Sequence, residues 1–218
     1  MTLSQNLDNL KIDRSKKHCL INPNSTMSNV SYSVKHYEPY SEQFEIEDHF
    51  SLTITKHKRS TKIIMQVLHQ EIDTEHIPSI VEILEEQLPT VLQTTCYNEE
   101  NLPFAVEVQR TEIGHLFEHI LLEYLCQYKM QKGASQAAYN GRTHWNWYKD
   151  RIGQFHIRLT CGKADHDIFP NALDKSIALM KYIYEVCDKN VLAEQQTSNH
   201  TGVKNGSKQL LKLMQQES

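Results

Sequence analysis

The sequence lacks several features that would assign it to well-known classes of protein. It has five cysteines in 218 residues, at positions 19, 96, 126, 161 and 187, and none form a CxxC pair. This spacing disfavours a disulfide framework or a cysteine zinc knuckle and favours a reducing compartment. The first residues contain no apolar signal core, and no apolar run approaches the length of a membrane span. We therefore expect a cytoplasmic protein with no membrane partner.

A strongly basic charge is also missing. The chain has 23 Lys and Arg against 27 Asp and Glu, for a formal net charge of −4. This balance gives no support for a nucleic-acid partner, which would favour a basic surface. The unusual count is 12 histidines, because histidine is the commonest metal ligand in proteins.

The composition predicts one globular domain between two polar ends. Residues 1–44 are rich in Asn, Ser and Lys and are predicted to be a poorly ordered arm, ending in a short strand near residues 31–37. Residues 45–190 carry the regular apolar patterns of a single domain. Residues 191–218 are polar again and are predicted to be a C-terminal tail.

Within this domain, apolar periodicity predicts the order strand, strand, helix, short strand, helix, strand, helix. The first two strands, 49–57 and 61–69, form an antiparallel pair. A helix follows, capped by Asp73 or Thr74 with Pro78 in its first turn, and then a short strand at 104–109. A helix over 112–131 is capped by Thr111 and ended by Gly133. A long loop, a strand at 154–161 and a helix at 172–187 complete an α+β fold, a mostly antiparallel sheet with helices on one face.

The helix expected at 112–131 carries an unusual set of polar residues. His115, Glu118, His119 and Glu123 lie opposite its main apolar face. Leu122, Cys126 and Met130 share that side, so it is expected to be partly covered and to hold the polar groups in a pocket. Buried polar groups without partners cost about 1–3 kcal/mol each, so these four must find partners.

Three of these residues form the pattern H-x-x-E-H, the inverted zincin motif. His115 and His119 are four residues apart, so both imidazoles can reach one Zn²⁺ from adjacent turns. Glu118 would then be the general base that takes a proton from water activated by the ion. The alternative is a pair of core histidines bonded to carboxylates without any metal.

A catalytic zinc site usually has a third protein ligand. Glu123, one turn after His119, is the preferred candidate, although it could instead orient a ligand from outside the coordination sphere. Asp174 and Glu185, on the expected last helix, are the other candidates.

The loop after this helix contains basic and aromatic residues. Arg142, with His144, Lys149 and Arg151, could bind carboxylates of an acidic peptide, or could belong to an ordinary solvated loop. Trp145 and Trp147 are expected to pack the loop rather than line a substrate groove.

The stretch TEIGHLFEHILLEYLCQYKMQKG, followed by NGRTHWNWY and a strand, resembles the amino-terminal domain of cyanophycin synthetase. The resemblance extends over roughly residues 50–187 and is clearest at 111–143. It implies that His115, Glu118 and His119 form the site, with Glu123 as a trailing acid and Arg142 in the following loop.

In that family the domain precedes an ATP-grasp module and a Mur-ligase-like module, which together build a polymer of aspartate with arginine side groups. In some members the first domain resembles a zinc metallopeptidase that clips the polymer. This sequence contains neither module and no GxxxxGK[ST] phosphate loop, so we expect a free-standing relative rather than a synthetase.

These observations predict a zinc-dependent hydrolase of peptide or isopeptide bonds, with cyanophycin-like polymer or a related peptide as substrate. The alternative is a non-catalytic accessory module that binds the polymer or a synthetase. The sequence leaves the oligomeric state open, a homo-oligomer included.

Overall fold

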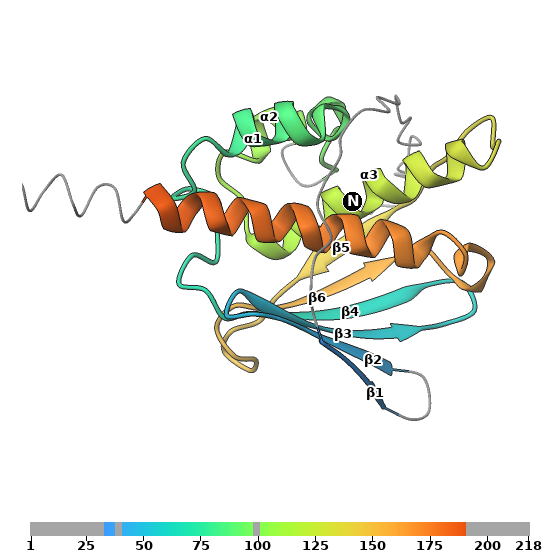
Figure 1. Cartoon of the computed structure of the whole chain (residues 1–218), viewed down its shortest axis with the longest axis horizontal. Helices are drawn as coiled ribbons and strands as arrows, with labels where there is room; N and C mark the ends of the chain where they lie inside the picture. Colours follow the sequence, from blue (N-terminus) through green and yellow to red (C-terminus); the bar gives the residue numbers. More distant parts are fainter. Residues whose placement is uncertain (1–32, 38–40, 98–100, 191–218) are drawn as a thin grey trace, which may run out of the picture.

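The computed structural model describes residues 33–37, 41–97 and 101–190. They form an α+β fold in which helices cover one face of an antiparallel sheet, as predicted (Figure 1). The predicted C-terminal tail and most of the predicted N-terminal arm lie outside the described residues. Among the described residues, no helix is both long enough and apolar enough to span a bilayer.

The sheet has six strands in the order β1-β2-β3-β4-β6-β5, and all neighbouring pairs are antiparallel. The strands are β1 (Ser33–Tyr37), β2 (Ser41–Ile46), β3 (Phe50–Lys56), β4 (Thr61–Val67), β5 (Gly141–His144) and β6 (Gln154–Leu159). The predicted pairing of the strands at 49–57 and 61–69 is confirmed, with Leu52 opposite Met65. β1 and β2 begin within residues 1–44, so the sheet starts before the predicted boundary at residue 45.

The helical layer consists of α1 (Ile80–Gln87), the 3-10 turn η1 (Pro89–Gln93), α2 (Phe104–Glu107), α3 (Ile113–Gln131) and a helix over residues 169–190. A second 3-10 turn, η2 (Lys163–Asp165), precedes that last helix. The last helix starts three residues before and continues three residues past the predicted range of 172–187.

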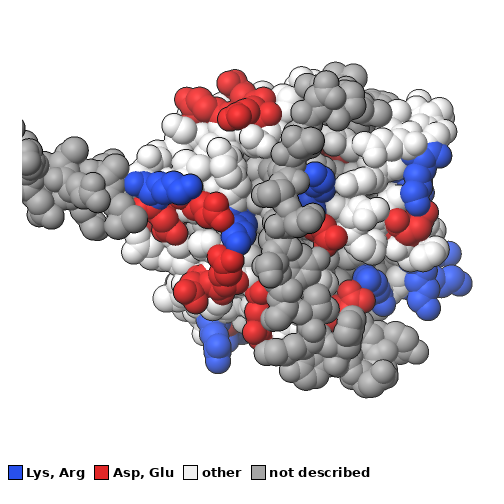
Figure 2. Space-filling model, in the orientation of Figure 1, with Lys and Arg blue, Asp and Glu red and all other residues white. Residues whose placement is uncertain are grey.

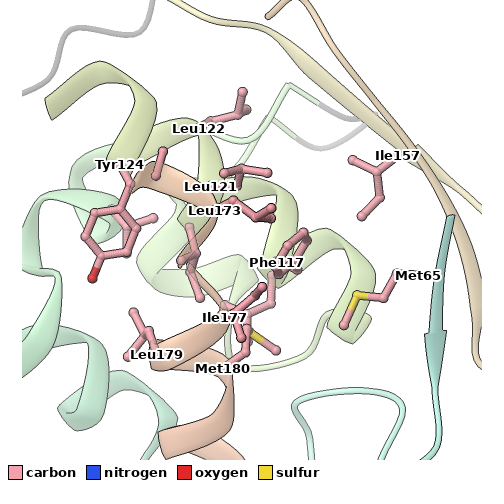
Figure 3. Close-up of a cluster of buried hydrophobic side chains, with 14 of the residues drawn as sticks. Met65, Phe117, Leu121, Leu122, Tyr124, Ile157, Leu173, Ile177, Leu179 and Met180 are labelled. Atoms are coloured by element: carbon pink, nitrogen blue, oxygen red, sulfur yellow. The ribbon is translucent and has the colours of Figure 1, made fainter. Parts of the chain in front are cut away.

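Alternating side chains of the central strands build the core. In β4, Ile63, Met65 and Val67 are buried, while Lys62 and Ile64 on the other face are exposed. Side chains from the sheet, α3 and the helix at 169–190 meet in one buried cluster (Figure 3). The labelled members include Met65 and Ile157 from the sheet, Phe117 and Leu121 from α3, and Leu173 and Ile177 from the last helix. Burying one such side chain stabilises the fold by about 1.5–3 kcal/mol.

The predicted start of the first helix is wrong. α1 begins at Ile80, after Ser79, whose φ of 58° lies in the left-handed region. Asp73 and Thr74 instead connect this segment to the start of α3. Asp73 forms an isolated bridge with Glu112, and the Thr74 hydroxyl donates to the carbonyl of Thr111. The two residues that the sequence offers as helix caps, Asp73 and Thr74, thus make tertiary contacts instead.

The short strand predicted at 104–109 is also wrong, because residues 104–107 form α2. Pro103 precedes this turn with a φ of −56°, which is compatible with a helix start. Alternation of apolar residues predicts a strand only where a partner strand is available, and here Pro103 pairs only through an isolated bridge with Thr95.

Two further differences concern the start of α3 and the segment that follows it. Thr111 provides no side-chain cap, since the residue at the N-cap is Glu112, without a capping bond. Gly133 follows the C-cap residue with a φ of 88°, and the predicted helix end is confirmed there. The segment after it, predicted to be all loop, contains the edge strand β5. β5 consists of Gly, Arg, Thr and His, so it carries no apolar alternation that could reveal it.

Charged side chains of both signs are interspersed on the face drawn in Figure 2, and a group of acidic side chains gathers over α1. α1 carries three exposed glutamates, Glu82, Glu85 and Glu86. This face therefore presents no extended basic surface, in line with the net charge.

Candidate metal centre

α3 is enclosed on nearly all sides. Of its residues from Ile113 to Cys126, all are buried except His115, which is half-buried. A helix surrounded in this way normally carries apolar residues all round. The polar residues Glu118, His119 and Glu123 are 3–4% exposed, so each needs a partner within the protein.

His115 lies between a threonine and a cysteine. Its Nδ1 is 2.7 Å from the hydroxyl oxygen of Thr111, and its Nε2 is 3.4 Å from Sγ of Cys96. Thr111 is thus the partner that sets the orientation of this ring, which explains its position one turn before His115.

His119 stacks on a buried phenylalanine. The ring of Phe104 in α2 lies 3.9 Å from the His119 ring, at an interplanar angle of 9°. His119 Nδ1 is 3.3 Å from the hydroxyl oxygen of Thr94, which follows η1. The rings of His115 and His119 are 4.8 Å apart and nearly perpendicular. The two imidazoles are therefore adjacent, as the spacing of four residues predicts.

Cys96 completes a group with the two histidines. Potential ligand atoms of Cys96, His115 and His119 all lie within 4.8 Å of one another. Cys96 is buried, and its backbone N–H donates to the carbonyl of Leu102, which holds the segment after η1 beside α2. The sequence alone does not connect Cys96 to this site, because no motif links it to a helix that begins 17 residues later.

Glu118 lies against β5. Its Oε2 accepts a hydrogen bond of 2.6 Å from the Thr143 hydroxyl. A Cβ at position 141 would lie 2.3 Å from Oε1 of Glu118, so Gly141 leaves the room that this carboxylate occupies. The edge strand therefore supplies both the hydrogen bond and the space that hold Glu118.

Glu123 belongs to a separate hydrogen-bond network. Its Oε1 accepts hydrogen bonds from the Thr90 hydroxyl (2.6 Å) and from Nε2 of Gln127 (3.2 Å), which also donates to Thr90 (3.1 Å). The two other predicted candidates for a third ligand are on the helix at 169–190, where Asp174 is exposed and Glu185 lies 3.9 Å from Lys181.

Arg142 lies on β5 between the two residues that contact Glu118. Because successive side chains of a strand alternate, it lies on the opposite face of the sheet. There it is in register with Arg158 of β6, which is itself in register with Lys62 of β4, and all three are exposed. The structure thus separates Arg142 from Glu118 and places it in a basic row across three strands.

The other residues of the loop have structural partners. Trp145 and Trp147 both pack edge-on against Phe155, as expected for residues that pack the loop. His144 stacks on His156 at 5.1 Å, and His156 Nε2 lies 3.1 Å from an oxygen of Asp150.

Carboxylates also gather at the start of α3. Burial raises the pKa of Glu112, and the nearby charges of Asp73 and Glu107 raise it further, although a backbone hydrogen bond opposes them. Farther along α3, burial raises the pKa of Tyr124, whose hydroxyl is buried. Burial thus shifts the pKa of ionisable groups at the start and in the middle of α3.

Residues 62–149 match the family model described as the cyanophycin synthase-like N-terminal domain. The match contains all of α3 and β5, and it supports the resemblance over these residues, a shorter range than the 50–187 expected. A search of curated proteins found no match.

Proposed function

We propose that this protein is a zinc-dependent hydrolase of peptide or isopeptide bonds that acts on cyanophycin-like polymer. The observation that supports this most is the placement of three side chains of α3. His115 and His119 are adjacent, and buried Glu118 precedes His119 in the same turn. They lie within the segment that matches the cyanophycin synthase-like domain.

The residues at the site fit a zinc ion by their chemistry. Imidazole and thiolate groups are ligands that Zn²⁺ prefers, whereas Mg²⁺ and Ca²⁺ prefer oxygen. His115 and His119 would hold the ion, which when bound supplies a Lewis acid for the carbonyl and a lowered pKa for water. The threonines at the Nδ1 atoms of both histidines fit the outer partners that orient metal-binding imidazoles.

Glu118 is proposed as the general base. The Thr143 hydroxyl donates to one carboxylate oxygen and fixes the rotamer, while Gly141 leaves the space that the other oxygen occupies. In this proposal Glu118 accepts a proton from the attacking water and passes it to the leaving amine, so that one peptide bond and one water give a carboxylate and an amine. Thr143 is a positioning residue for this step.

We propose that the basic row of Lys62, Arg142 and Arg158 binds carboxylates of the polymer that lie at a distance from the bond to be cleaved. Arginine can bind a carboxylate through two parallel hydrogen bonds. β5 carries Arg142 on one face and the Thr143 contact to Glu118 on the other. A polymer chain that crosses this edge of the sheet could therefore contact both Arg142 and the site of Glu118.

The first experiment measures zinc in the purified protein, with His119→Ala and the exposed His76→Ala as a matched pair of variants. We expect about one zinc per chain in the wild type and in His76→Ala, and a loss in His119→Ala. Absence of metal from the wild type after zinc has been offered would contradict the proposal.

The second experiment measures release of new amine ends from cyanophycin-like polymer. Glu118→Gln should abolish the release while leaving zinc bound, because an amide cannot accept the proton. Glu85→Gln, on the exposed face of α1, is the matched control and should keep full activity. Activity that survives in Glu118→Gln would remove Glu118 from the mechanism.

A non-catalytic accessory module is the second candidate. The burial of Glu118 and its bond to Thr143 favour it, since these contacts also fasten α3 to the edge strand without any chemistry. In that case the protein would bind polymer or a synthetase without releasing amine ends. A reducing compartment such as the cytoplasm suits both candidates, because no disulfide joins the four cysteines that the structure describes.

A further inference from the structure

Among the strands that the structure describes, β5 has a neighbour on one side only, because it ends the sheet next to β6. It pairs with β6 in antiparallel register, with Arg142 opposite Arg158. Just before β5, the N–H of Thr160 donates to the carbonyl of Asn140 at 2.8 Å. This bond identifies Asn140 and Thr160 as a hydrogen-bonded pair of the ladder, and it sets the phase of the pairs that follow.

The backbone groups of β5 point alternately toward β6 and away from it, because hydrogen-bonded and non-hydrogen-bonded pairs alternate along an antiparallel ladder. Those of Asn140, Arg142 and His144 are directed at β6. Those of Gly141 and Thr143 are directed at the free side of the strand, where no described residue forms a backbone hydrogen bond with them. Outward N–H and C=O groups at a sheet edge are a template for another extended chain.

The free edge of β5 borders the site on α3. Gly141 leaves the space that one oxygen of Glu118 occupies, and the Thr143 hydroxyl donates to the other oxygen. The two residues whose backbone groups point outward are therefore also the two that contact Glu118. A chain bound at this edge would lie next to the residues that hold the carboxylate.

His115 indicates where α3 is open. At 3.6 residues per turn, it lies around the helix between Glu118, which faces β5, and His119, which faces α2. It is also the only residue from Ile113 to Cys126 that is not buried. The exposed part of this stretch therefore lies between α2 and the free edge of β5, and a chain at that edge passes beside the histidine pair.

A chain paired with β5 would present its side groups to two different surroundings. Side chains of a strand alternate between its two faces, so one set would lie on the side of α3 and the other on the side of Arg142. Arg142 belongs to the basic row with Lys62 and Arg158, on the face of the sheet opposite Glu118. Carboxylates of an acidic peptide match this second side in charge.

We propose that the main chain of the peptide substrate binds as an added antiparallel strand at the free edge of β5, paired with the backbone of Gly141 and Thr143. In such a ladder each of these residues exchanges two hydrogen bonds with one substrate residue, and the two substrate residues are two positions apart. Main-chain hydrogen bonds then provide the affinity, and the side groups provide the selectivity. The proposal rests on the proposed function for the chemical class of the substrate, but it concerns binding and not cleavage.

Amide hydrogen exchange in the free full-length protein, followed residue by residue by NMR, tests the state of the edge. We expect rapid exchange at Gly141 and Thr143, whose N–H groups point outward. We expect slow exchange at Arg142 and His144, whose N–H groups are bonded to β6. Equal protection of all four amides would overturn the proposal, because the edge would then already be covered.

The same measurement with a ligand tests the binding. The probe is a synthetic oligomer of aspartate with arginine side groups, added to Glu118→Gln so that it stays intact. At a ligand concentration of about 100 times Kd only about 1% of the protein is free, so exchange at Gly141 and Thr143 should slow by up to about 100-fold. Arg142 and His144 are the internal controls, and their exchange should change little. Binding of the oligomer without slower exchange at Gly141 and Thr143 would overturn the proposal.

A matched pair of variants isolates the backbone donor of Thr143. Thr143→Val and Thr143→Pro both lose the hydroxyl that donates to Glu118, but only proline also lacks the outward N–H. Proline is tolerated on an edge strand where the N–H faces outward. Thr143→Pro should therefore bind the oligomer about 2–10-fold more weakly than Thr143→Val, the effect of one hydrogen bond. Isothermal titration calorimetry measures the two Kd values and circular dichroism checks the fold; equal Kd values in two folded variants would count against the added strand.

The outcomes separate this inference from the proposed function. Slower exchange at both outward amides without release of amine ends would support the added strand and refute the hydrolase, leaving the accessory module. Release of amine ends with unchanged exchange at the edge would overturn the added strand and keep the hydrolase. An oligomer that is neither bound nor cleaved would overturn both.

Discussion

Gly114 allows α3 to approach the sheet closely, and its replacement by alanine is predicted to destabilise the fold. A Cβ at this position would lie 2.3 Å from Cγ and 2.6 Å from Cβ of Phe155. Phe155 is fully buried in β6, between β4 and β5. The atoms that would clash are those next to the backbone, so a rotation of the phenylalanine ring cannot relieve the contact.

Two effects of opposite sign compete in Gly114→Ala. Alanine is favoured over glycine by about 1 kcal/mol in a helix interior, and this is an upper limit for Gly114, the second residue of α3. Overpacking of a filled core costs about 1–3 kcal/mol, and sometimes more. Because the contact lies well inside van der Waals distance, we expect the clash to exceed the helix propensity, with a net loss of about 1–2 kcal/mol. For a chain of this size the melting temperature should fall by on the order of 2–8 °C.

Urea unfolding of the wild type and of Gly114→Ala measures this difference through the midpoint of the transition. A Phe155→Ala background provides the matched test, since removal of Cγ and Cδ1 at the contact should reduce the effect of alanine at position 114 by at least about 0.5 kcal/mol. A Gly114→Ala protein as stable as the wild type, or more stable, would show that α3 does not pack as closely on β6 as the structure indicates.

Two further predictions concern buried ionisable groups. Burial alone would raise the pKa of Asp165, but hydrogen bonds from Tyr139 (2.8 Å) and Lys129 (3.0 Å) lower it. Asp165 therefore contributes stability above its unfolded pKa of about 3.9 that is lost as the pH falls through its lower folded pKa. Asp165→Asn should lower the free energy of unfolding by about 1–3 kcal/mol at pH 7. In unfolding curves at decreasing pH, the stability of the wild type should approach that of the variant. A stability difference at pH 3 equal to that at pH 7 would contradict this prediction. Burial lowers the pKa of His49, which stacks on Tyr184 at 5.3 Å, so its contribution is present above an unfolded pKa of about 6.5 and is lost on acidification below it. His49→Phe should lose less stability than the wild type between pH 7.5 and pH 5.5 in urea unfolding, and an equal or larger loss in the variant would contradict the assignment.

Much of the fold follows from local patterns that the sequence contains. The strands β3, β4 and β6, the long helix α3 and the helix at 169–190 all have an apolar period that matches their structure. Gly133 marks the end of α3 through a backbone conformation that favours glycine. The periodicity of apolar residues and a glycine at the end of a helix are local properties of the sequence, so they could be recognised without a structure.

The elements that were missed depend on neighbours. β5 has a polar sequence and is a strand because it pairs with β6. α2 has an alternating sequence and is a helix because its position beside His119 offers no strand to pair with along its length. In both segments, tertiary contacts decide whether the backbone forms a strand or a helix, because the local strand propensity of the residues is weaker than those contacts.

The sequence by itself determined that two histidines and a glutamate would lie on one buried helix, because a spacing of three and four residues on an α-helix sets their relative direction. Only the tertiary structure decided which groups complete the site. It placed Cys96 beside the histidines, bonded Glu123 to Thr90, and placed Arg142 on the opposite face of the sheet from Glu118. These contacts join segments that are distant in the chain, and the packing that brings such segments together is not a property of any local stretch of sequence.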